Sequence, residues 1–356
     1  MRAILAGGGT GGHVIPALAI AHELDSNYGA RVMFIGTARG IENRLVPAAG
    51  YELRLVQVGA LKKVSLATRV QTLLALPTAV FKASEILKEF RPDIVIGVGG
   101  YASGPGMLAA ALSGIPTIAF EPNVVPGFAN RVLAIAVSAA AVQFEQTCTY
   151  FRRCAVVGVP VRRAFFEIHA KTSGPPTILV SGGSQGAHAL NQAVMGALGA
   201  LQERVPGIHI IHQTGERDYN EAQGTYLRAE VSAEVTPFIE RMPEAFARAD
   251  LLVCRSGAST VGEVAAAGKP AIFVPFPHAT DDHQLRNAEV LARAGAAVVI
   301  EEKDLTSERL TEVVAELFAD PAQRARMAAA ARSMAHEDAA GQVARMAAKL
   351  AGVAED

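Results

Sequence analysis

The feature that most constrains the fold is a glycine-rich loop near the N-terminus, residues 7–13, with the sequence GGGTGGH. It follows the apolar run 3–6 and precedes an apolar-periodic stretch that is typical of a helix. Glycine has no Cβ atom, so a strand, a glycine loop and a helix in succession let backbone N–H groups approach a phosphate closely. The segment predicts an α/β fold with a phosphate-binding loop at the end of its first strand.

The same loop has the Gly7-x-Gly9-x-x-Gly12 spacing of dinucleotide-binding units. Such a unit needs an acidic residue at the end of its second strand to bind the ribose hydroxyls. Here the second expected strand, 32–35, is followed by Gly-Thr-Ala-Arg, and Glu42 comes later, inside the next helical pattern. No P-loop motif is present either. We therefore expect a phosphate ligand other than NAD.

The composition excludes several classes of function. A net charge of −1 gives no global basic field, so nucleic acid is not expected as a partner. The apolar stretch 94–120 is interrupted by glycines and prolines, which argues against a transmembrane helix. The three cysteines, Cys148, Cys154 and Cys254, form no CxxC or metal-type cluster. We expect them to be buried, reduced side chains, with no bound metal.

Short β-like runs alternate with helical patterns twice along the chain, which predicts two parallel sheets. The strands expected in the first half are 3–6, 32–35, 52–58, 94–98, 117–120 and 139–143. Those expected in the second half are 177–181, 208–212, 234–237, 251–254, 271–274 and 297–300. A proline- and glycine-bounded linker lies around 157–176, so we expect domains 1–160 and 161–356. The last helix is a candidate to pack back on the first domain.

Each expected domain opens with a glycine loop that carries a candidate functional side chain. His13 ends the first loop, where it is either a titratable group in a site or a packed residue at a helix start. The second loop, 182–187, has the sequence GGSQGA. Its Ser184 hydroxyl can donate to a phosphate, although a tight turn alone explains one of its glycines.

The segment 254–269, CRSGASTVGEVAAAGK, admits two interpretations. In the first, Ser259 or Thr260 caps a helix and Glu263 completes a capping box. In the second, the helix start faces a diphosphate and Glu263 accepts hydrogen bonds from a ribose diol. Arg255 would then add positive charge beside the same phosphates.

Three further segments follow expected strands. Asp281 and Asp282 begin a helix, where acidic residues are more often caps than metal ligands, and Gln284 suits sugar hydroxyls. The loops 99–104 and 121–123 are expected on the same sheet edge as the first glycine loop. The basic and apolar stretch from Leu61 to Lys82 is either an ordinary amphipathic helix or a membrane-binding surface.

Seven motifs in this order resemble the MurG-type transferases of bacterial peptidoglycan synthesis, in glycosyltransferase family 28, over essentially the whole chain. The motifs are GGGTGGHVIPALAIA, GVGGYASGP, EPNVVPGFANR, GVPVR, GGSQGA, CRSGASTVGEVAAAGKP and the helix at 284–287. The resemblance implies a GT-B fold, in which two Rossmann-like domains face each other across a cleft. It implies inverting, metal-independent transfer of N-acetylglucosamine from UDP-GlcNAc to the MurNAc 4-hydroxyl of lipid I, which gives lipid II. It also implies a peripheral protein at the cytoplasmic face of the inner membrane, with no cofactor.

By motif position, the resemblance implies substrate-binding roles for residues of both domains. These are Thr10, Gly11, Gly12, Asn123, Arg162, Ser184, Ile239 (through its backbone, beside the uracil), Ala258, Ser259, Thr260, Val261, Gly262, Glu263 and Gln284. Phe120 stands where many relatives have histidine, so His13 is the candidate general base and Glu121 its rival. The resemblance also favours the membrane interpretation of the stretch from Leu61 to Lys82.

The sequence leaves open three alternatives to this function. A GT-B transferase could act on another lipid acceptor such as diacylglycerol. A UDP-GlcNAc epimerase would need no lipid acceptor. A non-catalytic UDP-sugar-binding protein would keep Glu263 but lose turnover.

Overall fold

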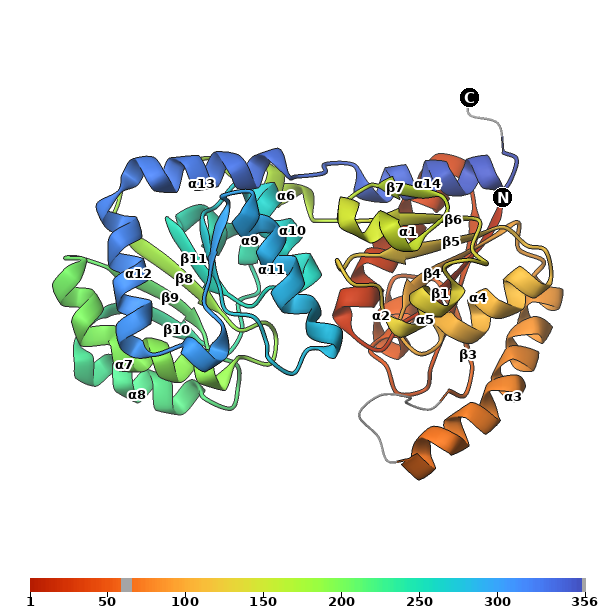
Figure 1. The fold of residues 1–356 in the computed structure, drawn as a ribbon, viewed down its shortest axis with the longest axis horizontal. Coiled ribbons are helices and arrows are strands. Elements are labelled where there is room, and N and C mark those ends of the chain that lie inside the picture. Colours follow the sequence, from red (N-terminus) through yellow and green to blue (C-terminus); the bar gives the residue numbers. More distant parts are fainter. Residues whose placement is uncertain (59–65, 354–356) are drawn as a thin grey trace. The chain divides into compact units, whose positions relative to one another are not determined.

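The computed structural model describes residues 1–58 and 66–353, with the backbone alone for 66–74. The chain forms two compact units (Figure 1). Unit 1 comprises Met1–Pro160 and Asp338–Asp356, and unit 2 comprises Val161–Glu337. The final helix, α14 (Ala339–Leu350), therefore belongs to unit 1, where it packs against α1 (Gly11–Tyr28).

Unit 1 is a seven-stranded parallel sheet in the order β3-β2-β1-β4-β5-β6-β7. Its strands are β1 (Arg2–Gly7), β2 (Arg31–Gly36), β3 (Glu52–Leu55), β4 (Ile94–Gly99), β5 (Thr117–Glu121), β6 (Ala139–Val142) and β7 (Cys154–Val156). Its other helices are α2 (Glu42–Ala48), α3 (Leu66–Phe90), α4 (Ser103–Leu112), α5 (Phe128–Leu133) and the 3-10 helix η1 (Glu145–Tyr150). Helix α1 packs against α2 and α14, and α4 packs against α3 and α5.

Unit 2 is a six-stranded parallel sheet in the order β10-β9-β8-β11-β12-β13. Its strands are β8 (Thr177–Ser181), β9 (His209–Gln213), β10 (Ser232–Thr236), β11 (Leu251–Cys254), β12 (Ala271–Phe273) and β13 (Ala297–Val299). Its helices are α6 (Arg163–Phe166), α7 (His188–Arg204), α8 (Tyr219–Ala229), α9 (Met242–Arg248), α10 (Ala258–Ala267), α11 (His283–Arg293), α12 (Ser307–Ala319) and α13 (Pro321–Ser333), with the 3-10 turns η2 (Thr280–Asp282) and η3 (Glu302–Asp304).

The central strands are continuous apolar runs because helices cover both faces of each sheet. Residues Ala3, Ile4, Leu5 and Ala6 of β1 are all completely buried. In unit 2 the same holds for Ile178 and Val180 of β8, which pack with α7 and α12 in one core. The predicted α/β class with two Rossmann-like parallel sheets is confirmed.

In each sheet the strand order reverses once, between β1 and β4 in unit 1 and between β8 and β11 in unit 2. In open parallel sheets, ligands bind beyond the carboxyl ends of the strands at this switch point. We therefore expect ligands to bind at the loops that follow β1 and β4 in unit 1 and β8 and β11 in unit 2. They contain both glycine loops that the sequence singles out.

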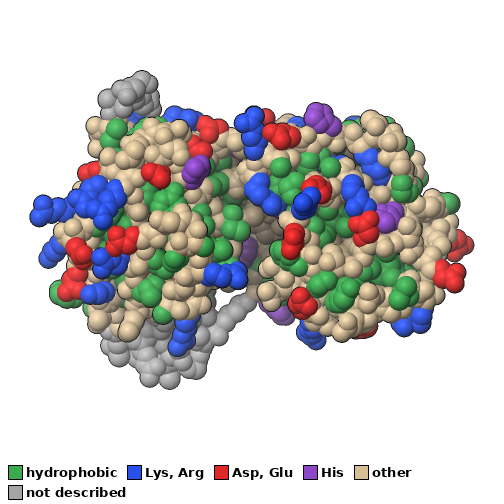
Figure 2. Space-filling view, turned by 180° about the vertical axis from the view of Figure 1, so that it is seen from behind, with side chains coloured by type: hydrophobic (Ala, Val, Ile, Leu, Met, Phe, Trp, Pro, Cys, Tyr) green, Lys and Arg blue, Asp and Glu red, His purple; other side chains and the backbone are tan. Residues whose placement is uncertain are grey.

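All of the expected strands form. The structure differs from the prediction in one additional strand at a sheet edge and in the ends of individual strands. The sequence did not predict β7, three half-buried residues at the sheet edge that lead into the expected linker. Strand β3 ends at Leu55 rather than 58. Among the described residues, no helix could cross a bilayer. On the face drawn in Figure 2, basic and acidic side chains are interspersed over both units.

Candidate functional site

The two loops at the switch point of unit 1 pack backbone against backbone. Gly8 N–H donates to Gly99 O at 3.2 Å. A Cβ on Gly7 would overlap Gly99 O, and one on Gly100, where φ is +81°, would overlap Gly8 O. Glycine is required here because any side chain would separate the two loops.

A buried carboxylate, whose role the sequence did not indicate, fills the inside of the first glycine loop. Glu42 is 1% exposed and accepts hydrogen bonds from Gly9 N at 2.7 Å and from Thr37 N at 2.9 Å. The amides of Gly8 and Gly9 are therefore bonded within the protein rather than to a phosphate. This narrows the predicted phosphate-binding loop to the start of α1, where Thr10 and Gly12 are exposed and no side chain caps the helix.

His13 is the third residue of α1, and its ring is held by the loop that precedes it. Its Nδ1 lies 3.1 Å from Gly8 O and 3.2 Å from Thr10 Oγ1. A carbonyl oxygen can only accept, so Nδ1 carries the proton and Nε2 is unprotonated in the neutral ring. This tautomer makes Nε2 the nitrogen that can take a proton from a substrate.

Glu121, the alternative candidate for the general base, is hydrogen-bonded within the loop that follows β5. It ends β5 and is 3% exposed. Its Oε1 accepts from Asn123 N and Nδ2, both at 3.1 Å, and its Oε2 accepts from Gly127 N at 2.8 Å and Asn130 Nδ2 at 3.0 Å. Burial raises the pKa of Glu121, and these four hydrogen bonds oppose the shift. The carboxylate orients the loop and the Asn123 side chain, and these four hydrogen bonds argue against Glu121 as the proton acceptor.

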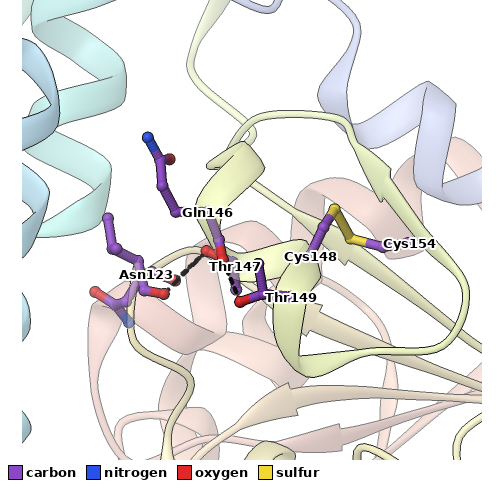
Figure 3. Close-up of a disulfide and its surroundings, with 7 residues drawn as sticks. Asn123, Gln146, Thr147, Cys148, Thr149 and Cys154 are labelled. Carbon is purple, nitrogen blue, oxygen red and sulfur yellow. Dashed lines mark hydrogen bonds between the residues drawn. A yellow bond between two sulfur atoms is a disulfide. The ribbon is translucent and has the colours of Figure 1, made fainter.

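The same loop is tied to a disulfide that the sequence did not predict (Figure 3). Thr147 Oγ1 in η1 donates to the carbonyls of Asn123 and Val124, both at 3.1 Å. The next residue, Cys148, is bonded to Cys154 at the start of β7, with 5.4 Å between the Cα atoms. The expectation of three reduced cysteines is wrong, because the turn from η1 into β7 brings two of them within bonding distance. Cys254 alone of the three is a free, buried thiol.

In unit 2, the glycine loop after β8 is held by contacts with residues at the end of β9, and its tip is exposed. Gln213 Nε2 donates to Gly183 O at 2.8 Å, and a Cβ on Gly186 would overlap Thr214 O. Asn191 Nδ2 donates a hydrogen bond to Thr214 O at 2.8 Å. Ser184 lies at the exposed tip of this loop, as a hydroxyl that contacts a phosphate must.

A buried polar chain that the sequence did not reveal continues below Asn191. Asn191 Oδ1 lies 3.0 Å from His212 Nε2, and His212 Nδ1 lies 3.0 Å from the Tyr226 hydroxyl. Burial lowers the pKa of His212 to about 4, so its ring is neutral. Asn191 Nδ2 also donates to Asp218 at 2.8 Å, and Asp218 binds His188 at the start of α7. These bonds fix the first turn of α7 directly behind the loop.

Helix α10, after β11, begins without a side-chain cap. Its N-cap is Gly257, in an extended conformation, and the helix starts at Ala258. Among the described residues, none caps it with a side chain, so Ser259 and Thr260 are not the caps of the first interpretation. A helix N-terminus without a cap leaves N–H donors and the positive end of the dipole for a ligand. This geometry removes the capping interpretation and leaves the second, in which the helix start faces a diphosphate; α1 begins in the same way, without a side-chain cap.

The Arg255 side chain is bound to residues other than those at the start of α10. The side chain is 10% exposed, and its Nη1 donates to the carbonyls of Val274 and Pro275 at 3.1 Å. Its Nη2 pairs with Glu302. The predicted phosphate contact for Arg255 is therefore corrected: the guanidinium ties β11 to the loop after β12 and to η3.

Glu263, in the second turn of α10, lies beside an arginine from a distant motif. Its side chain is 24% exposed, and Arg162 Nη2 lies 3.9 Å from its Oε1. Burial raises the pKa of Glu263 to about 7, and the Arg162 guanidinium opposes this shift. Arg162 itself lies over the Phe165 ring at 5.1 Å. The structure thus brings together two residues that the sequence placed in separate motifs.

The loops after β10 and β12 supply the other expected contacts. Ile239 is half-buried in the loop between β10 and α9. Gln284 Oε1 accepts from Phe276 N at 3.0 Å, which fixes its side chain. Asp282 is the N-cap residue of α11, as expected, where its charge complements the helix dipole, but its side chain makes no capping hydrogen bond. In the described chain, no group of three His, Cys, Asp or Glu could hold a metal ion.

Comparison with known proteins identifies the family. Residues 3–142 match the glycosyltransferase family 28 N-terminal domain, and residues 177–343 match the family 28 C-terminal domain. The chain belongs to glycosyltransferase family 28. The Solibacter usitatus UDP-N-acetylglucosamine–N-acetylmuramyl-(pentapeptide) pyrophosphoryl-undecaprenol N-acetylglucosamine transferase is 45% identical over 96% of this chain and 94% of its own length. An Anaeromyxobacter sp. protein of the same name is 45% identical over 97% of this chain and 91% of its own.

A solved structure agrees with this assignment. The crystal structure of Acinetobacter baumannii MurG matches 98% of this chain and 99% of its own, with 36% identity and a TM-score of 0.82. The predicted GT-B architecture is confirmed, and so is the predicted membership of the MurG-type family 28 enzymes. The protein is a glycosyltransferase.

Proposed function

We propose that this family 28 glycosyltransferase moves N-acetylglucosamine from UDP-GlcNAc to the MurNAc 4-hydroxyl of lipid I, with inversion at the anomeric carbon, and so forms lipid II. The observation that carries the proposal is the uncapped start of α10 at the switch point of unit 2, with Glu263 one turn further on. The names of the near-full-length relatives supply the substrates.

Unit 2 carries the donor in this proposal. The diphosphate lies against the N–H groups from Ala258 to Thr260, and Ser184 donates to it from the facing loop. Glu263 accepts hydrogen bonds from the two ribose hydroxyls, since one carboxylate matches a vicinal diol. The remaining expected contacts are the Ile239 backbone at the uracil, Arg162, Val261, Gly262, and Gln284 at the sugar.

Unit 1 carries the acceptor and the proton transfer in this proposal. Of its expected contacts, Thr10 and Gly12 are exposed, and Gly11 and Asn123 are half-buried. The acceptor hydroxyl forms a bond to C1 of N-acetylglucosamine while the bond from C1 to the diphosphate oxygen breaks. The hydroxyl proton moves to His13 Nε2, and the electron pair of the broken bond leaves with UDP. The N–H groups of α10 and the Ser184 hydroxyl balance the charge of the departing UDP. Loss of one such donor typically costs about 2.7–4 kcal/mol of transition-state stabilisation.

The first test follows UDP release with UDP-GlcNAc and a lipid I analogue. We expect release that depends on the acceptor, and we expect His13→Ala to lower kcat about 100-fold or more while the Kd for UDP-GlcNAc stays within twofold. General-base removal affects the transition state rather than donor binding. Unchanged turnover in His13→Ala would remove this residue from the mechanism.

The alternatives give different results in the same assay. Release with diacylglycerol but not with the lipid I analogue would identify another acceptor. Formation of an epimerised UDP-sugar without any acceptor would indicate an epimerase. Protection against heat by UDP-GlcNAc, with no turnover under any condition, would indicate a binding protein.

The second test uses the pH dependence of donor binding. Glu263 has a pKa of about 7, so it is largely ionised at pH 8 and largely protonated at pH 6. If only the carboxylate binds the ribose diol, affinity for UDP-GlcNAc falls about tenfold from pH 8 to pH 6. Calorimetry measures this directly. Glu263→Gln is expected to bind weakly at both values and to lose the pH dependence; a flat profile in the parent protein would contradict the assignment.

We also infer peripheral association of unit 1 with an anionic membrane. Helix α4 packs against both α3 and α5, and these elements expose large apolar side chains. They are Phe81 (64% exposed) in α3, Leu112 (75%) at the end of α4 and Val132 (57%) in α5, and Ile135 (73%) follows α5. Lys82 and Arg131 are exposed beside them, and this mixture of basic and apolar groups suits an anionic lipid surface. Of the stretch from Leu61 to Lys82, residues up to 65 lie outside the described chain.

The third test measures sedimentation with vesicles that contain anionic phospholipid. Leu112→Asp is expected to lower the bound fraction, because it places a negative charge at the lipid surface. Leu227→Asp in unit 2 is the matched control, since Leu227 is also 75% exposed. Equal binding by the two variants would contradict the assignment of this surface.

A further inference from the structure

Glu42 and His13 bind opposite sides of one peptide group. Gly9 N–H donates to Glu42 Oε2 at 2.7 Å, and Gly8 C=O lies 3.1 Å from His13 Nδ1. These N–H and C=O groups belong to the same peptide, the one that joins Gly8 to Gly9. A continuous chain of hydrogen bonds therefore runs from a buried carboxylate through a backbone amide to the imidazole.

The carboxylate end of this chain is fixed in place. Besides Gly9, Glu42 accepts from Thr37 N at 2.9 Å and Thr37 Oγ1 at 3.1 Å. A Cβ on Gly36 would lie 2.7 Å from Glu42 Cγ, and one on Gly8 or Gly40 would overlap the carboxylate. The side chain fills a space that three glycines leave between the first loop, the end of β2 and the start of α2.

The histidine end is held by the loop after β4. A Cβ on Gly99 would lie 2.9 Å from His13 Cδ2 and 3.0 Å from Nε2, so the ring lies flush against this glycine. Gly8 N–H donates to Gly99 O, which fixes the residue that accepts from the ring. Rotation of the imidazole would break its bond to Gly8 or bring it into the backbone at Gly99.

We propose that Glu42 is a positioning residue for proton transfer and acts on His13 through the Gly8–Gly9 peptide. A carboxylate that accepts from the N–H of a peptide polarises it and makes its C=O a stronger acceptor. The C=O holds the proton on Nδ1 and so keeps Nε2 unprotonated for the acceptor hydroxyl. When Nε2 takes that proton, the same chain stabilises the imidazolium, and the proton later leaves to solvent.

This arrangement is equivalent to a carboxylate–histidine pair in which a peptide group lies between the carboxylate and the imidazole. In serine hydrolases the carboxylate contacts the ring directly and holds its tautomer and orientation. Here the backbone of the glycine loop transmits the effect, which explains why a negative charge is buried in a loop whose motif otherwise suits phosphate. The inference rests on the proposed role of His13 as the base.

The experiment is a double-mutant cycle with Glu42→Gln, which keeps the size of the side chain and removes its charge. We expect kcat to fall about 10- to 100-fold, as for supporting partners of catalytic groups. The Kd for UDP-GlcNAc should stay within twofold, which also shows that the variant is folded. In a His13→Ala background, Glu42→Gln should change the remaining rate less than twofold, because it acts through the missing ring. An equal loss in both backgrounds would overturn the proposal.

Asn43→Ala is the matched control. Asn43 Nδ2 donates to Thr37 O at 2.7 Å and Gly40 O at 3.0 Å, so it supports the same segment without touching the Gly8–Gly9 peptide. We expect its kcat to stay within twofold of the parent protein. A loss as large as that of Glu42→Gln would mean that general loop integrity, rather than the hydrogen-bonded chain, sets the rate.

Nitrogen-15 NMR of labelled histidine tests the chain without turnover. The parent protein should show His13 with a protonated Nδ1 and an unprotonated Nε2 when the ring is neutral, and Glu42→Gln should show a mixture of tautomers. A protonated Nε2 in the neutral parent protein would overturn the proposal. If the tautomer is as expected but His13→Ala turns over normally, the proposed function of His13 fails while its coupling to Glu42 stands.

Discussion

The close approach of two backbone loops beyond the first strand of each sheet is the constraint on which the rest of the structure depends. In unit 1 the loops after β1 and β4 touch through Gly8, Gly99 and Gly100. In unit 2 the loop after β8 meets the loop after β9, where side chains on Gly186 or Gly215 would overlap backbone atoms. A methyl group at these positions would separate the loops, and the groups that they carry would lose their alignment.

The two units use this shared construction for different chemistry. In unit 1 the loop encloses the Glu42 carboxylate, which occupies the Gly9 amide, and it orients the imidazole of His13. In unit 2 the loop presents Ser184, and the uncapped α10 lies on the other side of the switch point. A buried negative charge suits a proton acceptor, whereas free helix donors suit a diphosphate. Because α1 also begins without a side-chain cap, the buried Glu42 charge is what distinguishes the two loops, and it supports unit 2 as the site proposed for the diphosphate.

Much of this could be predicted from the sequence, because its signals are local. Hydrophobic runs bounded by glycine gave the strands, and the repeated strand–glycine loop pattern gave two Rossmann-like sheets. What could not be predicted depends on long-range contacts. Nothing near Glu42 in the sequence indicates that it bonds to Gly9, and Arg255 looks like a phosphate ligand until Glu302 is found beside it. The Cys148–Cys154 bond likewise depends on the turn into β7, whose three residues carry too weak a pattern to predict a strand.

The central claim is that the diphosphate of the donor binds at the start of α10 and not on the glycine loop of unit 1. A crystal structure of the protein with UDP-GlcNAc tests it most directly. The account predicts phosphate oxygens within hydrogen-bond distance of the backbone N–H groups at Ala258–Thr260 and of the Ser184 hydroxyl, with the ribose on Glu263. A diphosphate bound instead by the loop from Gly7 to His13, with the start of α10 vacant, would contradict it.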